Sequence, residues 1–202
     1  MILFELVGNE EHKAYQDLSI DNLERQYFFL RSIINAAVAL QRPMISTAII
    51  TALNFHAISC LHVNAGQYRP CPVTVGGYTP PDYYRVPELM NAFVNEVNHA
   101  WEQSDAVALA TDVLWKLNFI HPFINGNGRT ARALCYFVVC VKSGGLLKGD
   151  TALPDLIRAN RAEYVTLLKE ADKGHKDGVP DYLRGLHGFL VRLVEQQLQS
   201  AT

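Results

Sequence analysis

The sequence predicts a mainly α-helical fold, a helical bundle with one short β-hairpin. Apolar residues recur at three- and four-residue intervals in successive segments, which is the spacing of one buried helix face. One stretch, residues 72–81, instead alternates over a few residues and is then broken by Gly-Gly and Pro-Pro, as in a hairpin. With 202 residues, 49% of them hydrophobic, the chain is long enough to bury the core of one domain.

Residues 1–49 are expected to form an N-terminal helical segment packed on the rest of the domain. Residues 1–18 are loosely patterned and predict a strand or coil followed by a short helix. Ser19 and Asp21 are suitable N-caps for a helix over residues 21–40. Pro43 is expected to end this helix, because proline lacks the N–H that a continuing helix needs.

The remaining helices follow from the same periodicity. They are expected over residues 46–64, 86–101, 106–120, 129–141, 158–171 and 179–199. In the first of these, His56, Cys60 and His62 lie close enough in sequence to suggest a metal site. Core or half-buried polar side chains are the favoured interpretation, because no further ligands complete the set. Trp101 and Trp115 are expected in the core.

Composition excludes several function classes. The formal net charge is −2 and the pI about 6.4, which argues against a nucleic-acid interface. The first residues carry no basic region, so no signal peptide is expected. No apolar run approaches the roughly 18–20 residues that span a bilayer. The four cysteines form no Cys-x-x-Cys pair and favour reduced thiols. These features predict a cytoplasmic protein without membrane or nucleic-acid partners.

The stretch from His121 to Arg132 carries the functional signal. It reads His-Pro-Phe-Ile-Asn-Gly-Asn-Gly-Arg-Thr-Ala-Arg between two predicted helices. Glycines on both sides of Asn127 permit a tight nest of backbone N–H groups. A helix N-terminus and two arginines three residues apart, Arg129 and Arg132, favour a bound polyphosphate. Cations there do not stabilise a helix, so a binding role is indicated. His121 precedes the loop, where an imidazole can act as a general base.

This stretch resembles the signature of the Fic (Fido) family, which runs His-Pro-Phe-any-Asp/Glu-Gly-Asn-Gly-Arg-any-any-Arg. The resemblance covers residues 50–190, the expected Fic core, and leaves residues 191–202 as the end of the last helix. Asn125 departs from the pattern, since the family has Asp or Glu there. The matching residues are His121, Pro122, Phe123, Gly126, Asn127, Gly128, Arg129 and Arg132.

The resemblance implies a protein adenylyltransferase that transfers AMP from ATP to a Ser, Thr or Tyr hydroxyl of a target protein. It implies His121 as the general base and residues 126–128, with Asn127 at their centre, as the anion-binding nest. Arg129 would hold the phosphates and Arg132 would orient the terminal phosphate. Position 125 would hold the Mg²⁺ or Mn²⁺ that bridges the phosphates. Residues 160–171 resemble the helix near which the family seats the nucleotide base.

Asn125 leaves three interpretations open. An amide carbonyl can ligate Mg²⁺ but brings no negative charge, whereas Mg²⁺ usually takes carboxylates together with substrate phosphates. The chain could be a weakened but active enzyme, an enzyme with a changed nucleotide or metal preference, or a nucleotide- or protein-binding module without catalysis. An engineered substitution is also open. The active enzyme is favoured, because the base, the nest and both arginines are present. The kinase variant of the fold ranks lower, since it usually has Lys where this chain has Gly128.

The predicted hairpin has a simple interpretation and a functional one. Composition alone favours a surface turn. The family resemblance implies a flap whose edge pairs with the target backbone by strand addition. The expected flap residues are Val73, Thr74, Val75, Gly76, Gly77 and Tyr78.

The family resemblance also suggests how activity is restrained. Many members carry an inhibitory helix with Ser/Thr-x-x-x-Glu-Gly/Asn, whose Glu pairs with the second motif arginine. The nearest match here, Thr166 to Glu170, is followed by alanine and lies inside a predicted core helix. We therefore expect ordinary helix surface there, and any inhibition to come from a separate small antitoxin-like partner.

Overall fold

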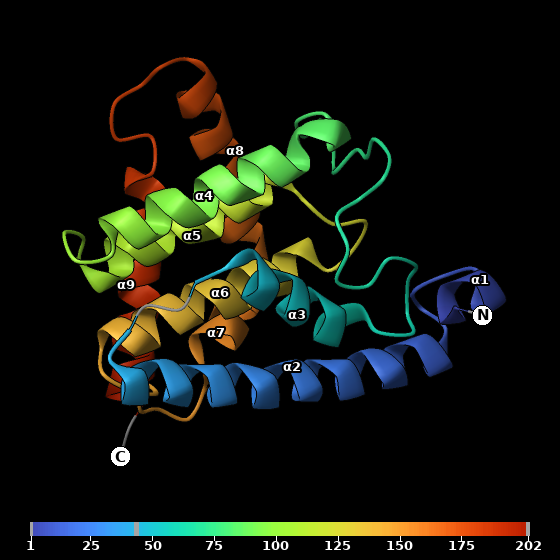
Figure 1. Cartoon of the computed structure of the whole chain (residues 1–202), viewed down its shortest axis with the longest axis horizontal. Coiled ribbons are helices and arrows are strands. Elements are labelled where there is room, and N and C mark those ends of the chain that lie inside the picture. The colour runs from blue at the N-terminus through green and yellow to red at the C-terminus, as the bar shows by residue number, and fades with distance from the viewer. Residues whose placement is uncertain (1, 43–44, 201–202) are drawn as a thin grey trace.

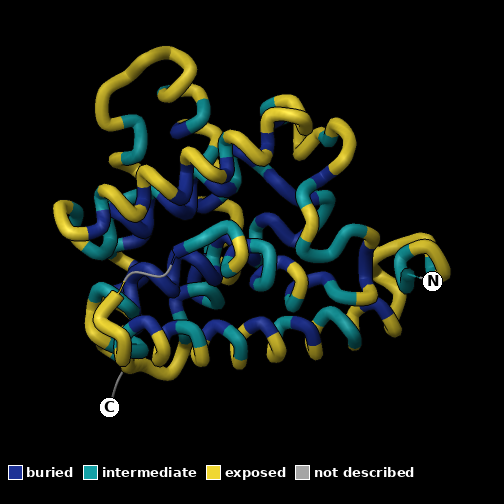
Figure 2. Tube along the Cα trace, in the orientation of Figure 1, coloured by how far each residue is buried: buried dark blue, intermediate teal, exposed yellow. Residues whose placement is uncertain are grey.

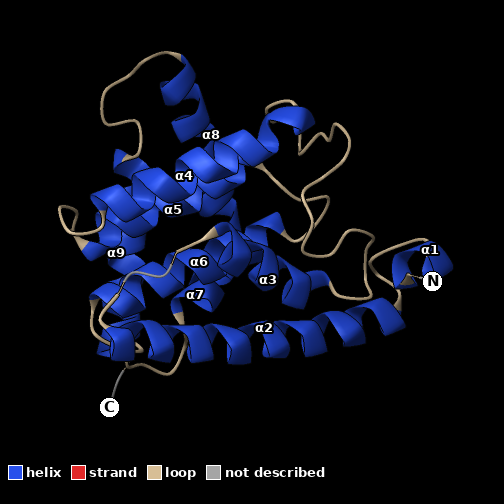
Figure 3. Cartoon of the chain, viewed as in Figure 1, coloured by secondary structure: helices blue, strands red, loops and turns tan. Residues whose placement is uncertain are grey.

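Two neighbouring helices, α5 and α6, form the centre of the fold (Figure 1). The computed structural model describes residues 2–42 and 45–200, and within them the chain is mainly helical, as predicted (Figure 3). The helices are α1 (Leu3–Val7), α2 (Lys13–Leu40), α3 (Thr47–Ile58), the 3-10 turn η1 (Tyr83–Arg85), α4 (Val86–Ala100), α5 (Ala106–Ile120), α6 (Asn127–Lys142), α7 (Leu153–Ala159), α8 (Arg161–Lys176) and α9 (Arg184–Gln199).

Helix α6 is the most buried element. Ala131 and the run from Ala133 to Cys140 are all buried, so this stretch of the helix is covered on every side, as an evenly apolar stretch must be (Figure 2). The helices α2 and α3 pack against it, while α4 and α9 pack on α5 and α7 lies beside α6. Trp101 and Trp115 are buried, as predicted.

The six-residue connection between α5 and α6 is the motif loop, so the packing of the two central helices fixes its position.

Helix α2 is longer than predicted. It begins at Lys13 rather than at residue 21, because the ring of His12 accepts the N–H of Ala14 and caps the helix there. Ser19 and Asp21 are therefore interior residues of α2, and their prediction as caps is wrong. The helix ends at Leu40, where Gln41 adopts a left-handed conformation. Pro43, the predicted terminator, lies outside the described residues.

Other boundaries also differ from the prediction, and the last helix, α9, begins at Arg184 rather than at residue 179. Helix α3 ends at Ile58 rather than at residue 64, and Cys60 and Asn64 adopt positive φ in the turns that follow. The predicted helix over 158–171 is two helices, α7 and α8, which break at Asn160. Helix α8 continues to Lys176, five residues beyond the predicted end at residue 171.

The predicted hairpin is a tight turn without strands. No strand is present in residues 2–42 and 45–200. Val75 and Tyr78 instead form one antiparallel bridge, exchanging two backbone hydrogen bonds of 2.9 Å across Gly76 and Gly77. Both glycines have positive φ, as a two-residue hairpin turn requires. Pro70 and Pro72 precede it and lack N–H donors, which disfavours a longer ladder.

None of the helices in the described ranges combines the length and the hydrophobicity that crossing a bilayer requires.

Candidate active site

A cavity of about 560 Å³ opens where the motif loop meets α2, α8 and the 75–78 turn. Its wall is strongly cationic and includes four arginines, Arg129, Arg132, Arg158 and Arg161. The predicted residues His121, Asn125, Gly126 and Gly128 also line it, as do Val75 and Tyr78 of the predicted flap. Asn127 and the flap residues Val73, Thr74, Gly76 and Gly77 do not line it. Most of the predicted site thus converges on one cavity.

His121 lies where α5 ends. It is the C-cap residue in a left-handed conformation, with φ 51°, and its N–H bonds the carbonyl of Leu117 at 3.0 Å. Burial lowers the pKa of the imidazole to about 4, an effect that a hydrogen bond to the backbone of Asn118 opposes and the charge of Arg69 reinforces. The ring is therefore neutral at physiological pH and able to accept a proton.

The side chain of Asn127 fixes the loop rather than facing the cavity. Its Oδ1 accepts the N–H of Phe123 at 2.9 Å, and its Nδ2 donates to the carbonyl of Phe123 at 2.8 Å. Both residues are buried. The predicted nest consists of backbone N–H groups, so it stays a prediction, and the side chain of Asn127 holds the loop in the conformation that would present them.

Gly126 is required by conformation and by space. It has φ 78°, and a Cβ there would lie 2.7 Å from Cγ2 of Ile58 and 2.9 Å from Nδ2 of Asn54. Gly128 has no such conformational requirement, and a Cβ there would meet only the end of the flexible Arg132 side chain at 3.3 Å. Of these two glycines, only Gly126 lies too close to α3 to accept a Cβ.

Asn54 was not predicted to matter, yet it joins α3 to the motif loop. Its buried amide donates to the carbonyl of Asn125 at 2.9 Å and to Oγ1 of Thr130 at 3.3 Å. Its Oδ1 accepts the N–H of Gly66 at 3.0 Å. The only signal in the sequence is an amide placed within an otherwise apolar helix, and a buried amide needs such partners.

The two motif arginines differ in how they are held. Arg129 donates to the carbonyl of Ala57 at 2.8 Å and to Oδ1 of Asn125 at 3.1 Å. Burial lowers the pKa of both guanidinium groups, but an arginine remains charged at physiological pH. Within the described residues, Arg132 makes no hydrogen bond or ion pair. The Arg132 donors are therefore available to an anion in the cavity.

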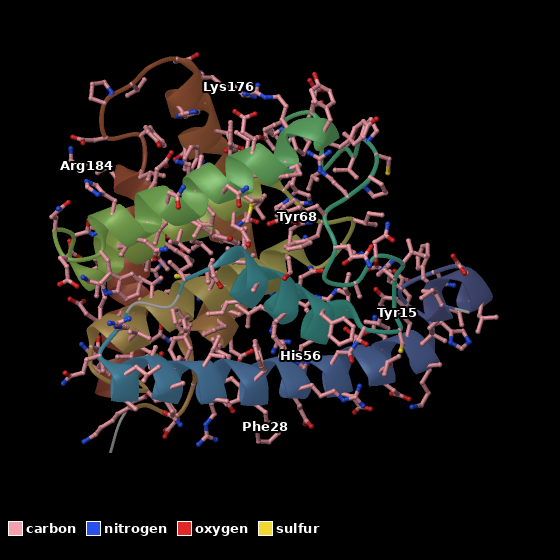
Figure 4. The ribbon with its side chains drawn as sticks, in the orientation of Figure 1. Tyr15, Phe28, His56, Tyr68, Lys176 and Arg184 are labelled. Atoms are coloured by element: carbon pink, nitrogen blue, oxygen red, sulfur yellow. The ribbon has the colours of Figure 1, made fainter. Side chains whose placement is uncertain are left out.

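A polar cluster closes the cavity on the side of Asn125. Oε1 of Glu10 lies 2.9 Å from Nδ2 of Asn125 and 3.2 Å from Nε2 of His62. The hydroxyl of Tyr15, at the N-terminal end of α2, lies 2.7 Å from the same His62 nitrogen (Figure 4). Burial lowers the pKa of His62, against the raising effect of Glu10. Neither Glu10 nor Tyr15 was predicted to belong to the site.

The geometry of Asn125 does not fit its predicted role as a metal ligand. Its Oδ1 accepts the N–H of Gly126 at 2.6 Å and Nη2 of Arg129 at 3.1 Å, so its carbonyl is already occupied. Its Nδ2 faces the carboxylate of Glu10. Among residues 2–42 and 45–200, no group of three His, Cys, Asp or Glu side chains lies close enough to hold a metal, and this includes the region of His56, Cys60 and His62.

The far wall of the cavity is built by α8 and the turn. Tyr164 and Leu168 of α8 line it, while Asn160 and Ala171 do not. Nδ2 of Asn118 donates to the hydroxyl of Tyr164 at 2.9 Å, which joins α5 to α8. Thr166 and Glu170, the near match to an inhibitory motif, are exposed.

Part of the chain is similar to known proteins. Residues 45–139 match the Fic/DOC family. The chain is 34% identical over 115 residues to "Protein adenylyltransferase Fic" of Drosophila grimshawi and 33% identical over 113 residues to the protein of that name of Drosophila willistoni. These matches cover 55% of this chain and 22% and 21% of the relatives, so the chain aligns with about a fifth of their length.

Solved structures share the fold. Fic-1 (residues 134–508) from C. elegans superposes with a TM-score of 0.71 at 23% identity, over 97% of this chain and 55% of that one. A Fic domain-containing signaling protein from Bacteroides thetaiotaomicron superposes with a TM-score of 0.68 at 22% identity, over 98% of this chain and 78% of that one. The motif, the cavity it lines and these similarities agree: residues 45–139 are similar to the Fic/DOC family, and the chain has the fold of the solved Fic structures.

Proposed function

We propose that this chain is a protein adenylyltransferase that moves AMP from ATP to a Ser, Thr or Tyr hydroxyl of a target protein and releases pyrophosphate. One observation carries the proposal. A neutral His121 lines the same cavity as Arg129 and Arg132, which lie in the first turns of a helix. The curated relatives named above are themselves called protein adenylyltransferases.

The chemistry follows from this arrangement. His121 accepts the proton of the target hydroxyl while the hydroxyl oxygen attacks the α-phosphorus of ATP. A new O–P bond forms, and the bond from the α-phosphorus to the bridging oxygen of pyrophosphate breaks. The N-terminus of α6 and the two arginines stabilise the negative charge on the phosphates. Tyr164 and Leu168 provide the wall for the adenosine moiety. A bound Mg²⁺ or Mn²⁺ would neutralise phosphate charge.

The 73–78 segment suits the role of a flap. Tyr78 anchors it, since its hydroxyl donates to the carbonyl of Phe119 at 2.8 Å and its ring lies 5.1 Å from Nζ of Lys176. Thr74, Val75, Gly76 and Gly77 are exposed. An extended target segment pairing with the backbone of residues 73–75 would place its hydroxyl at the cavity. The target protein, an antitoxin-like inhibitor and a cytoplasmic location stay predictions from the sequence.

Label transfer from α-³²P-ATP tests the proposal. The purified chain is incubated with a cell lysate and Mg²⁺ or Mn²⁺, and protein-bound label is measured. We expect label with the wild type, and a loss of about 100-fold or more with His121→Asn, since general bases contribute about 10²–10⁴-fold. Asparagine tolerates the left-handed backbone at this position, so the loop is preserved.

Two further variants separate enzyme from binding module. Arg132→Gln should lower labelling, while Arg184→Gln, an exposed arginine at the start of α9 (Figure 4), is the matched control and should not. Absence of label with retained ATP binding would favour the alternative, a Fic-fold module that binds nucleotide or protein without catalysis. Label in the His121→Asn variant at the wild-type level would contradict the proposed role of His121.

A further inference from the structure

Glu10 occupies a defined place in the cavity although it lies far from the motif in sequence. Oε1 of this carboxylate lies 2.9 Å from Nδ2 of Asn125, and the residue lines the cavity. The backbone around it is held in position. The Glu10 carbonyl accepts Nε2 of Gln16, and α1 is docked by hydrogen bonds from the N–H groups of Leu3 and Phe4 to the residue 60 and 61 carbonyls.

The charge of Glu10 is opposite to that of the arginines on the wall. The cavity is lined by one other carboxylate, Asp172, and Oδ1 of that residue accepts the indole N–H of Trp115 at 3.0 Å. The cavity is otherwise suited to a polyphosphate, with four arginines lining it. Within the described part of the chain, Glu10 forms no ion pair with a lysine or arginine, and its ion-pair neighbour is His62 at 3.2 Å. A carboxylate facing a polyphosphate repels it unless a cation lies between them. The side chain is 53% exposed, and no hydrogen bond to its second oxygen, Oε2, is present among the described residues.

We propose that Glu10, rather than Asn125, is the protein carboxylate that ligates the divalent cation accompanying the nucleotide. Mg²⁺ is commonly bound by one or two carboxylates together with phosphate oxygens and water, so a single glutamate suffices. Asn125 then acts as a positioning residue. Its oxygen is held by Arg129 and Gly126, and its Nδ2 orients the Glu10 carboxylate. The inference rests on the proposed function, since the phosphates of ATP complete the cation site.

The test measures metal and nucleotide binding separately. The probes are Mn²⁺, followed by its electron paramagnetic resonance signal, and α,β-methylene-ATP, which resists the expected cleavage. With the analogue bound, Glu10→Gln should weaken Mn²⁺ binding about 10–100-fold. In EDTA, the same variant should bind the analogue as tightly as the wild type or more tightly, because a repulsive charge has been removed. Glu11→Gln, the exposed neighbour, is the control and should change neither quantity.

A conservative variant distinguishes ligation from a structural role. Glu10→Asp keeps a carboxylate at this residue and should retain more Mn²⁺ binding than Glu10→Gln, because the ligating group is preserved. Unchanged Mn²⁺ affinity in Glu10→Gln would overturn the inference. So would an equal loss of analogue binding with and without metal, which indicates a structural role. If the wild type binds no analogue even with Mn²⁺, the proposed function fails as well, which is a distinguishable result.

Discussion

The guanidinium of Arg69 donates from Nε to the backbone carbonyl of His121 over 2.8 Å. The backbone N–H of Arg69 also bonds the carbonyl of Pro122 at 2.8 Å, and its two terminal nitrogens bond the carbonyls of Cys71 and Pro81. The residue is only 2% exposed. One buried cation therefore ties the segment that carries the turn to the residue proposed as the general base.

Replacing Arg69 by lysine should uncouple these segments. Lysine keeps the charge but lacks the planar guanidinium group that bonds three carbonyls at once. Some of the carbonyls of His121, Cys71 and Pro81 therefore lose their hydrogen-bond donor. We expect a loss of about 2–4 kcal/mol in the free energy of unfolding and a larger fall in label transfer than in ATP affinity. Chemical denaturation and the labelling assay measure these. Arg31→Lys, on the exposed side of α2, is the matched control, and equal stability of the two variants would refute the role of Arg69.

The glycine positions allow a graded test of the motif loop. Gly126→Ala combines a positive φ with close contacts to Ile58 and Asn54, so it should destabilise by several kcal/mol and abolish nucleotide binding. Gly144→Ala has a similar φ of 79° but open space and should cost only about 1 kcal/mol. Thermal unfolding and ATP titration measure the difference. Similar losses in both variants would show that the contact with α3 is unimportant.

Stability should depend on pH through His121. Its pKa is about 4 in the folded chain, lowered chiefly by burial, against an ordinary value of 6.5. Between pH 6.5 and pH 4 the unfolded chain binds a proton that the folded chain does not, so this residue makes folding less favourable as pH falls. His121→Asn should therefore gain stability relative to the wild type by on the order of 2 kcal/mol between pH 7 and pH 4.5. Parallel unfolding curves for the two proteins across this range would disprove the shift.

Tyr78→Phe tests the anchoring of the turn. The variant loses the hydrogen bond to the Phe119 carbonyl but keeps the ring contact with Phe119, 5.9 Å between centroids. Stability should fall by only about 1 kcal/mol, whereas the KM for a protein target should rise more than the KM for ATP. Tyr83→Phe, an exposed tyrosine outside the cavity, serves as control. An unchanged target KM would argue against a flap function for residues 73–78.

Structural features that depend only on neighbouring residues in the sequence were predicted well. The helix over residues 106–120 was predicted with its observed bounds, because Asp105 caps it and an apolar face runs along it. The beginning of α2 was not predicted, because Ser19 and Asp21 are acceptable caps for a shorter helix. Burial of Tyr15 stabilises the longer helix that is observed. The predicted hairpin is a single bridge in the structure. Strand pairing depends on backbone partners, and the periodicity of a sequence does not reveal them.

The sequence by itself determined the family resemblance, the helical class and the place of the motif loop between two helices, because residues 121–132 are contiguous and their pattern is local. The tertiary structure alone decided how that loop is held and which carboxylate faces the cavity. The contacts responsible join residues 52, 71 and 115 positions apart: Arg69 to His121, Asn54 to Asn125, and Glu10 to Asn125. No periodicity or motif encodes such pairs, since they form only when packing of the helices brings distant segments together and buried polar groups must find partners.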